Sequence, residues 1–453
     1  MFDAFLIFLT VLSAVIVAKF ILKKYNAIFV FFASGVVILM CASLLTGTSI
    51  LGKATLGNVF LDTFGFITKT FKSNISGIGT IIMVVTGYAA YMKHVGASTK
   101  LAYLASKPLS KIKNRYLVLS GVFIIGMALK LVLTSQASLA VLMLATVFPI
   151  LIALRITPMT AASTLALLCL DYGPNDGSTL FMANIAQMNV VDLFILYQSK
   201  VALCIIIVTA IVMPFYYSYM DKKDKETGNY ALGEEVTLKN PDIPVFYAFL
   251  PIVPLAIIFV AYFIPTVKID VITANVLGFA VTFICEFIRR VDRKEIPKDM
   301  VVILKAMGDI FVSVVSIIIS ASVFAEGIKI LGGITIFTNL ISEMHGAVLI
   351  VMVLLTGITF AFAVIMGSGA APFFAFGPLT PEIAEKLGVP TLTLLLPMEL
   401  ATALGRASSP VCGALIAVAG VANIAPMSLA KRTAPLLVLG LIVNIIASYI
   451  FTI

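Results

Sequence analysis

Two polar interruptions inside long apolar segments hold the residues of this chain that are best suited to chemistry. The first, 170–179, contains Asp171 and Asp176, and the second, 404–413, contains Arg406. A charged side chain at the centre of a bilayer costs about 2.5–3.5 kcal/mol even on the milder scales, so such residues are retained for pairing or for function. The planar guanidinium of Arg406 suits bidentate binding of a carboxylate. The aspartates could coordinate Na⁺, carry a proton or bind an ammonium group.

Each of these charged residues also has a structural interpretation. Arg406 could form a buried ion pair with Glu399, about two helical turns away, or with Asp171. Asp176 precedes Gly177 and could cap a helix there. Substrate contact and structural pairing therefore both stay open for Arg406. Asp171, Asp176 and Glu399 are predicted to take part in ion coupling or in sensing the charge of the substrate.

Two further interruptions, 134–138 and 367–372, place small residues where backbone could approach a ligand closely. Non-helical backbone survives in a bilayer only where it is buried in protein or lines a water-filled cavity. The amino ends of half-helices favour a carboxylate, whereas their carboxyl ends and free carbonyls favour Na⁺, so a Na⁺ site at these tips is possible. The alternative is that small residues merely pack membrane helices together. The predicted substrate-binding residues are Ser135, Gln136, Ser138, Asn175, Ser178, Thr179, Ser368, Gly369, Arg406, Ser408 and Ser409.

The composition is that of a polytopic membrane protein. Of the 453 residues, 61% are hydrophobic and 12% are charged, and the mean hydropathy is +1.11. Soluble domains are about one quarter charged. The five cysteines show no Cys-x-x-Cys spacing, which argues against disulfides and a zinc site. Gly-x-Ser-x-Gly, His-Glu-x-x-His and P-loop motifs are absent, so we expect neither an enzyme nor an ATP-driven pump, and no cofactor other than Na⁺.

The apolar segments predict an all-α membrane protein with two inverted repeats, 1–219 and 244–453, joined by a cytoplasmic linker at 220–243. Each repeat is expected to contain five transmembrane helices and one re-entrant hairpin, with broken helices at the midplane. Two ordinary spans joined by a tight turn would be the alternative to the first hairpin. The hairpins are predicted at about 116–156 and 346–388, the broken spans at 159–184 and 390–420, and the other spans near 4–22, 27–47, 75–92, 196–219, 244–264, 270–288, 305–331 and 434–453.

Landmark residues recur at a constant distance in the two halves. Ala89 and Gly96 precede Ala325 and Gly332 by 236 residues, and Pro174 precedes Pro410 by the same distance. Short interrupted segments at matching positions of two halves are the best sequence pointer to a transporter binding site.

The positive charges predict the orientation. With the N-terminus outside, most of the 31 Lys and Arg residues fall in cytoplasmic segments, as the positive-inside rule requires. The net charge of +9 is therefore topological, and no nucleic-acid partner is expected. We predict a multi-pass protein of the cell inner (plasma) membrane with both termini outside and the lipid bilayer as its partner.

Several motifs resemble the DcuC family of anaerobic C4-dicarboxylate carriers, within the ion transporter superfamily. Those of the second half are Gly-Ser-Gly-Ala-Ala-Pro-Phe-Phe-Ala-Phe at 367–376, Gly-Arg-Ala-Ser-Ser-Pro-Val-Cys-Gly at 405–413 and Lys-Arg-Thr at 431–433. In the first half, 87–97, 105–109 and 144–149 are also similar. The resemblance covers nearly the whole chain. It implies a homodimeric secondary carrier that works as an elevator, coupled to Na⁺, to H⁺ or to exchange of one dicarboxylate for another.

The sequence also departs from the family pattern. Asp171, Asp176 and Glu399 add negative charge near the expected site, and Lys130 adds positive charge. The leading prediction is uptake, efflux or exchange of succinate- or fumarate-like dicarboxylates. An amino acid carrier of the same fold, zwitterionic or cationic in its substrate, is the alternative. From other classes, an ion channel and a membrane-embedded enzyme using the two aspartates as an acid pair are less well supported.

Overall fold

The computed structural model describes residues 2–23, 25–46, 50–51, 54–111, 114–227, 242–264, 266–332 and 347–453. Helices form all the regular structure in these ranges, which confirms the all-α prediction. Seven of the described helical runs are long and apolar enough to cross a bilayer, so the protein is a multi-pass membrane protein. Most of the predicted linker, 228–241, lies outside the described residues.

The first half contains twelve described α-helices between Phe2 and Glu226. They are α1 (Phe2–Leu22), α2 (Ala27–Thr46), α3 (Val59–Asn74), α4 (Thr80–His94), α5 (Ala97–Ser106), α6 (Arg115–Lys130), α7 (Gln136–Thr146), α8 (Phe148–Ala153), α9 (Pro158–Ala166), α10 (Gly177–Ala186), α11 (Val190–Leu193) and α12 (Ser199–Glu226). Side chains that accept backbone N–H groups begin several of them, among them Asn114 at α6 and Thr157 at α9.

The second half opens with a 3-10 helix at Val245–Ile252 and ends close to the last residue. Its α-helices are α13 (Val253–Tyr262), α14 (Val271–Arg289), α15 (Asp299–Ile310), α16 (Ser316–Leu331), α18 (Ala347–Met366), α19 (Ala370–Phe376), α20 (Thr380–Leu387), α21 (Thr391–Ala407), α22 (Gly413–Val421) and α23 (Pro426–Thr452).

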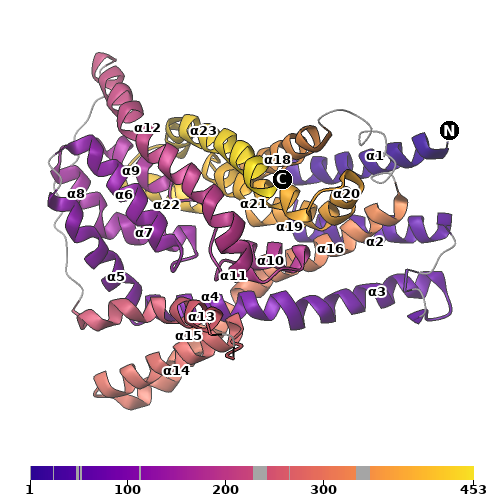
Figure 1. The fold of residues 1–453 in the computed structure, drawn as a ribbon, viewed down its shortest axis with the longest axis horizontal. Coiled ribbons are helices and arrows are strands. Elements are labelled where there is room, and N and C mark those ends of the chain that lie inside the picture. Colours follow the sequence, from indigo (N-terminus) through magenta and orange to yellow (C-terminus); the bar gives the residue numbers. More distant parts are fainter. Residues whose placement is uncertain are drawn as a thin grey trace.

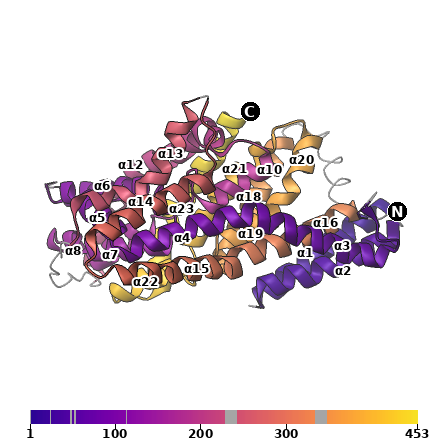
Figure 2. The same cartoon turned by 90° about the horizontal axis from the view of Figure 1, so that it is seen from below.

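The four predicted interruptions all fall between helices. The chain leaves the helical path between α6 and α7, between α9 and α10, between α18 and α19, and between α21 and α22. In Figure 1, α6 to α8 lie at one end of the molecule, and α18 and α20 lie towards the other. Figure 2 shows the same separation from a second direction.

One span starts earlier than predicted. Helical structure is continuous from Phe60 to His94, whereas we predicted a span at 75–92. The added part contains Asp62, Lys69 and Lys72, which lower its average hydropathy and hide it from a search for apolar segments. At 1.5 Å per residue, this run of 35 residues is longer than the hydrocarbon core of about 30 Å.

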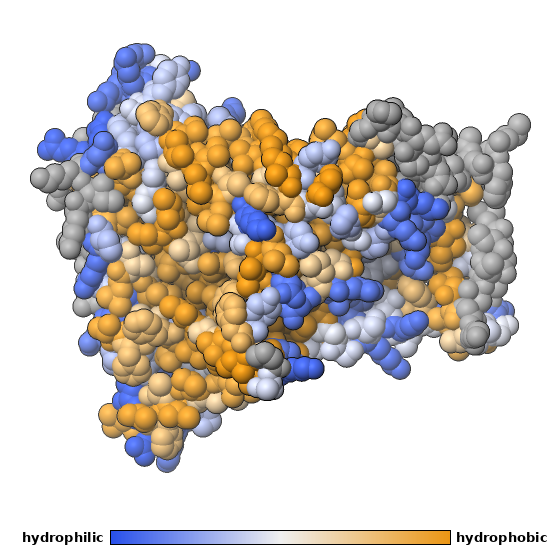
Figure 3. Space-filling model, in the orientation of Figure 1, coloured by the Kyte–Doolittle hydropathy of each residue, from blue (hydrophilic) through white to orange (hydrophobic). Residues whose placement is uncertain are grey.

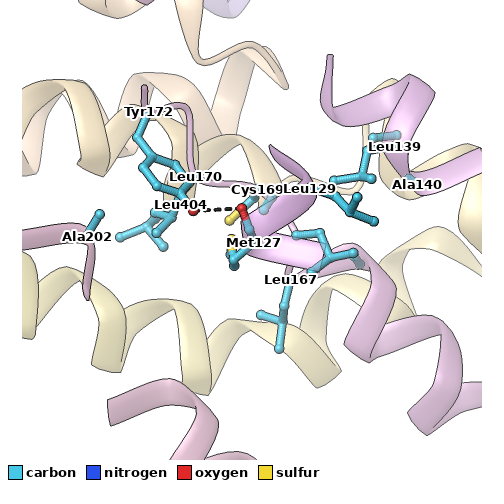
Figure 4. Close-up of a cluster of buried hydrophobic side chains, with 14 of the residues drawn as sticks. Met127, Leu129, Leu139, Ala140, Leu167, Cys169, Leu170, Tyr172, Ala202 and Leu404 are labelled. Atoms are coloured by element: carbon cyan, nitrogen blue, oxygen red, sulfur yellow. Dashed lines mark hydrogen bonds between the residues drawn. The ribbon is translucent and has the colours of Figure 1, made fainter. Parts of the chain in front are cut away.

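The core unites the two halves around the breaks. Leu404 of α21 packs in one buried cluster with Ala202 of α12 and with Leu167 and Leu170 from the first break (Figure 4). The Tyr172 hydroxyl donates a hydrogen bond of 2.7 Å to the carbonyl of Met127 in α6, which ties the break to the first hairpin (Figure 4). The two breaks are therefore held against each other by packing.

The outer surface is strongly apolar. Large hydrophobic side chains such as Phe215 and Ile288 are 74% and 77% exposed, respectively. Figure 3 shows this apolar surface across much of one face, with hydrophilic residues gathered at the edge beside α6 and α8 and in a second patch towards the opposite end. A face of this kind is solvated by lipid tails in a membrane protein.

Candidate functional site

A cavity of about 390 Å³ lies where the two breaks and the first hairpin tip meet. Polar groups from three of the four interruptions reach it, while α4 and the region around α15 supply an apolar wall with Ile82, Val85 and Ile310. Ligand sites in proteins commonly have volumes of about 300–1,000 Å³ and combine apolar walls with a few polar groups. The polar lining residues are Thr86, Thr134, Ser135, Gln136, Asp171, Asn175, Asp176, Ser178 and Arg406.

Asp171 binds two cations from opposite halves of the chain. Its Oδ1 lies 2.9 Å from Lys130 Nζ, and its Oδ2 lies 2.9 Å from Arg406 Nη2. Nη2 of the arginine also donates to the carbonyl of Cys169 at 3.0 Å, and Lys130 donates to the carbonyl of Thr134. The Lys130 side chain is fully buried. Of the two partners predicted for Arg406, the structure pairs it with Asp171.

The guanidinium of Arg406 keeps capacity for a further acceptor. Its side chain is 17% exposed, and its buried Nε has no hydrogen-bond partner within the described part of the chain. The amide oxygens of Gln136 and Asn175, two other lining residues, are likewise buried and unpartnered there. Since the oxygen and nitrogen of an amide are assigned from their partners, either end of these groups can be presented to a ligand. Unpaired buried polar groups are costly unless a ligand or water satisfies them.

The first break is fixed by local hydrogen bonds. Asp176 Oδ1 accepts from the backbone N–H groups of Ser178 and Thr179, at 2.8 and 3.2 Å, and so caps α10. Gly173 adopts φ = 107°, a conformation that a side chain would strain, and its N–H donates to Gln198 Oε1 at 3.1 Å. The predicted capping role of Asp176 is therefore observed, and its carboxylate also lines the cavity.

The second hairpin tip approaches α21 through glycines. Gly367 has φ = 64°, and a methyl group on it would lie 3.0 Å from the backbone of Val411. A methyl group on Gly369 would lie 3.1 Å from the carbonyl of Thr402 and 3.4 Å from Arg406 Nη1. The tip therefore touches the helix end that presents the arginine.

Glu399 lies one step away from the cavity in a buried polar network. Gln198 Nε2 donates to Glu399 Oε2 at 3.3 Å and to the Thr179 hydroxyl at 2.8 Å. Glu399 is 1% exposed, its Oε1 has no partner, and no cation contacts it in the part of the chain that the structure describes. Burying a carboxylate in this way is costly, so a neutral, protonated carboxyl is favoured at this position.

The predicted site residues divide into three groups. Those that line the cavity are Ser135, Gln136, Asn175, Ser178, Arg406, Asp171 and Asp176. Ser138 lines an adjoining cavity. Thr179, Ser368, Gly369, Ser408, Ser409 and Glu399 lie outside the lining, where they cap, pack or join the network behind it.

Sequence reasoning missed Gln198 and the wall on α4. Gln198 is fully buried, but it adjoins Ser199 and Lys200 in the sequence and so resembles the polar end of a span. Thr86 and Ala89 line the cavity from α4 and carry no polar signal that separates them from ordinary packing residues. No group of three or more His, Cys, Asp and Glu side chains could hold a metal among the described residues. The Na⁺ site stays a prediction.

Comparison with known proteins decides the family. Residues 5–452 match the DcuC family, described as C4-dicarboxylate anaerobic carriers. This chain belongs to the DcuC family. It is 32% identical over 437 residues to the anaerobic C4-dicarboxylate transporter DcuC of Escherichia coli strain K12, with 95% of this chain and 94% of that protein covered. It is 31% identical over 439 residues to the probable DcuC transporter of Vibrio cholerae, with 96% and 95% covered.

A solved structure has a related fold. The crystal structure of the YdaH transporter of Alcanivorax borkumensis, described as having an unusual topology, matches with a TM-score of 0.58 at 12% identity and covers 93% of this chain and 97% of its own. At that identity the match speaks for the fold alone. Membership of the DcuC family confirms the resemblance seen in the sequence and the prediction of a transporter rather than an enzyme.

Proposed function

We propose that this DcuC family member is a secondary transporter of C4-dicarboxylates, and that the cavity beside Arg406 binds the substrate. The observation that carries the proposal is an arginine with a free Nε that lines a cavity of about 390 Å³ between the two breaks. The names of the relatives supply the substrate class. Because charge-assisted bonds to a guanidinium are strong and directional, one substrate carboxylate would bind Arg406.

The charges around the cavity favour a dicarboxylate over a cationic amino acid. Lys130 and Arg406 together carry two positive charges, of which Asp171 neutralises one. Asp171 has both oxygens engaged, and Asp176 accepts two backbone N–H groups, so neither carboxylate is free for an ammonium group. The amino acid alternative would need one of these bonds to open.

Two inverted repeats and elevator-like alternating access are part of the proposal. A π-helical turn lies at Ile75–Gly79, and another lies 236 residues later at Phe311–Val315. Gly96 and Gly332, at the same distance, both adopt positive φ. Equivalent irregularities at one constant offset support a repeat, because they require the same local backbone in both halves.

We assign coupling to protons, with Glu399 as the residue that binds the proton. It is a buried carboxyl without a cationic partner in the described chain, and Gln198 and Thr179 connect it to the first break. Coupling to Na⁺ or to a counter-substrate would leave transport insensitive to a proton gradient. The orientation with both termini outside, the inner-membrane location and the homodimer also stay predictions, the last to be checked by mass measurement in nanodiscs.

Ligand-dependent thermal stability tests the proposed substrate. Purified protein is heated with succinate, fumarate, malate, aspartate, and neutral and basic amino acids, each with and without Na⁺. A ligand of the native state stabilises it by about 2.7 kcal/mol at 100 times Kd. We expect stabilisation by succinate or fumarate without a need for Na⁺. Stabilisation by amino acids alone would replace the dicarboxylate by the amino acid alternative.

Arg406→Ala tests the site within the same assay. We expect it to remove the stabilisation by succinate, because losing a desolvated charge partner costs about 2–5 kcal/mol of binding. Lys130 would still neutralise Asp171, so the protein should fold. Arg293→Ala, at an exposed arginine far from the cavity in sequence, is the control and should bind normally. Undiminished succinate binding by Arg406→Ala would exclude the arginine from the site.

A further inference from the structure

A second cavity adjoins the proposed substrate site. It has a volume of about 440 Å³ and shares Thr86, Ala89, Thr134 and Ser135 with the site cavity. The shared residues belong to α4 and to the tip of the first hairpin. The two cavities thus meet at the hairpin tip, and the second one extends from there along α4 and α7.

The second cavity contains groups that suit a carboxylate. Lys93, on the last turn of α4, lines it, is exposed, and has no acidic partner within the described residues. Ser98 is 3% exposed, and its hydroxyl also has no hydrogen-bond partner there. Thr99 and Ser138 add two further hydroxyl groups to the lining. A cation beside unpaired donors is a binding arrangement for an anion.

A third cavity occupies the equivalent position in the other half. It has a volume of about 290 Å³ and lies along α16 and α3. Its lining residues Ser322, Ala325, Glu326 and Lys329 follow Thr86, Ala89, Ala90 and Lys93 of the second cavity by 236 residues each. It shares no lining residue with the site cavity in the part of the chain described, so the site adjoins one of the two equivalent cavities.

We propose that the Lys93 cavity is a vestibular subsite, which captures a dicarboxylate before it moves past the hairpin tip to Arg406. The Lys329 cavity is the corresponding entrance for the opposite face. In the orientation proposed above, Lys93 faces the cytoplasm and Lys329 faces the outside. A cation at a mouth with low-dielectric walls raises the local concentration of an anionic substrate. The inference rests on the proposed dicarboxylate transport.

Sided transport assays with Lys93→Gln and Lys329→Gln test this assignment. Initial rates of succinate uptake are measured against concentration in inside-out vesicles, which present the cytoplasmic face, and in right-side-out vesicles. Lys93→Gln should raise KM about five-fold in inside-out vesicles, leave kcat unchanged and weaken the dependence of KM on ionic strength. Lys329→Gln should do the same only in right-side-out vesicles.

Three controls separate steering from other causes. Lys93→Arg keeps the charge and should retain the parent KM. Lys222→Gln removes an exposed charge from the end of α12, on the face assigned to Lys93, and should change neither constant. An unchanged KM and salt dependence for Lys93→Gln on both faces would overturn the subsite, as would a loss of kcat alone. If the unsubstituted protein moves no dicarboxylate, the proposed function fails and this inference with it.

Discussion

At the scale of single residues, one carboxylate organises the centre of the molecule. Asp171 neutralises a fully buried lysine and an arginine that comes from the other half of the chain. Neither cation could remain unpaired in an apolar interior without a large desolvation penalty. The ion triad is therefore both a structural joint between the halves and one wall of the proposed site.

Asp171→Asn should destabilise the substrate-free protein. Removing one partner of a buried ion pair typically costs about 3–5 kcal/mol, because the remaining charge is left uncompensated. The double variant Lys130→Met with Asp171→Asn should recover part of this loss, since it removes the stranded lysine too. Unfolding midpoints in detergent measure both. Asp309→Asn, at an exposed aspartate, is the control, and equal midpoints for Asp171→Asn and this control would contradict the joint role of the triad.

Glu399→Gln should uncouple transport from protons while leaving substrate binding intact. The amide mimics the neutral carboxyl and can keep the hydrogen bond with Gln198. We expect succinate exchange to continue, whereas uptake driven by a pH gradient should fall at least about ten-fold, to the level without a gradient. The matched control is Glu385→Gln at an exposed glutamate of α20. Unaltered gradient-driven uptake would remove Glu399 from the coupling mechanism.

The sequence predicted the charged residues of the triad better than their support. Arg406 and Asp171 could be picked out because an ionised side chain in an apolar segment is rare and costly. The choice between Asp171 and Glu399 as the arginine's partner needed three-dimensional geometry, since both lie within plausible reach. Gln198 stayed hidden because a polar residue next to the end of a span looks like an interface residue.

At the scale of elements, close backbone contact between α18 and α21 positions the arginine. A methyl group on Gly405 would lie 2.5 Å from the carbonyl of Phe360 and 2.9 Å from Ala363 Cβ. Backbone does not yield cheaply at such distances, because interiors are close-packed. The glycine beside Arg406 therefore sets how near the broken helix comes to the second hairpin.

Gly405→Ala should push these helices apart and weaken succinate binding. Overpacking costs about 1–3 kcal/mol, and the shift would displace the neighbouring guanidinium. Gly420→Ala on α22 is the matched control, because nothing lies within 4 Å of the added methyl group. It should fold and bind normally, with stability equal to or slightly above the parent. The two variants are compared by thermal shift with and without succinate.

The helices and their breaks were largely predictable, and their extents were less so. Glycine, proline and hydroxyl residues inside apolar segments marked all four interruptions, because helical backbone is disfavoured there. The early start of α3 was not predicted, since Asp62 and the two lysines make that helix resemble a loop in hydropathy. α5 was missed for a similar reason, being only ten residues long.

At the scale of the whole molecule, the basic residues predict which ends face the cytoplasm. Helix ends rich in Lys and Arg, such as those of α4 and α12, should lie inside. An alkaline phosphatase fused after Ile453 should then be active, and a green fluorescent protein fused there should be dark. The reverse should hold for fusions placed after Glu226, where α12 ends. A fluorescent fusion at the C-terminus would invert the proposed orientation.

The ion triad has a consequence for the kind of flux that the protein can support. An antiporter that must exchange cannot return empty, because its vacant site holds charges that only a second substrate balances. Here Asp171 already balances Arg406 when the cavity is vacant, so it acts as a built-in counter-anion. The vacant carrier can then reorient, and succinate should leave loaded vesicles for substrate-free buffer at a rate close to that of exchange. Asp171→Asn should convert this net efflux into obligatory exchange.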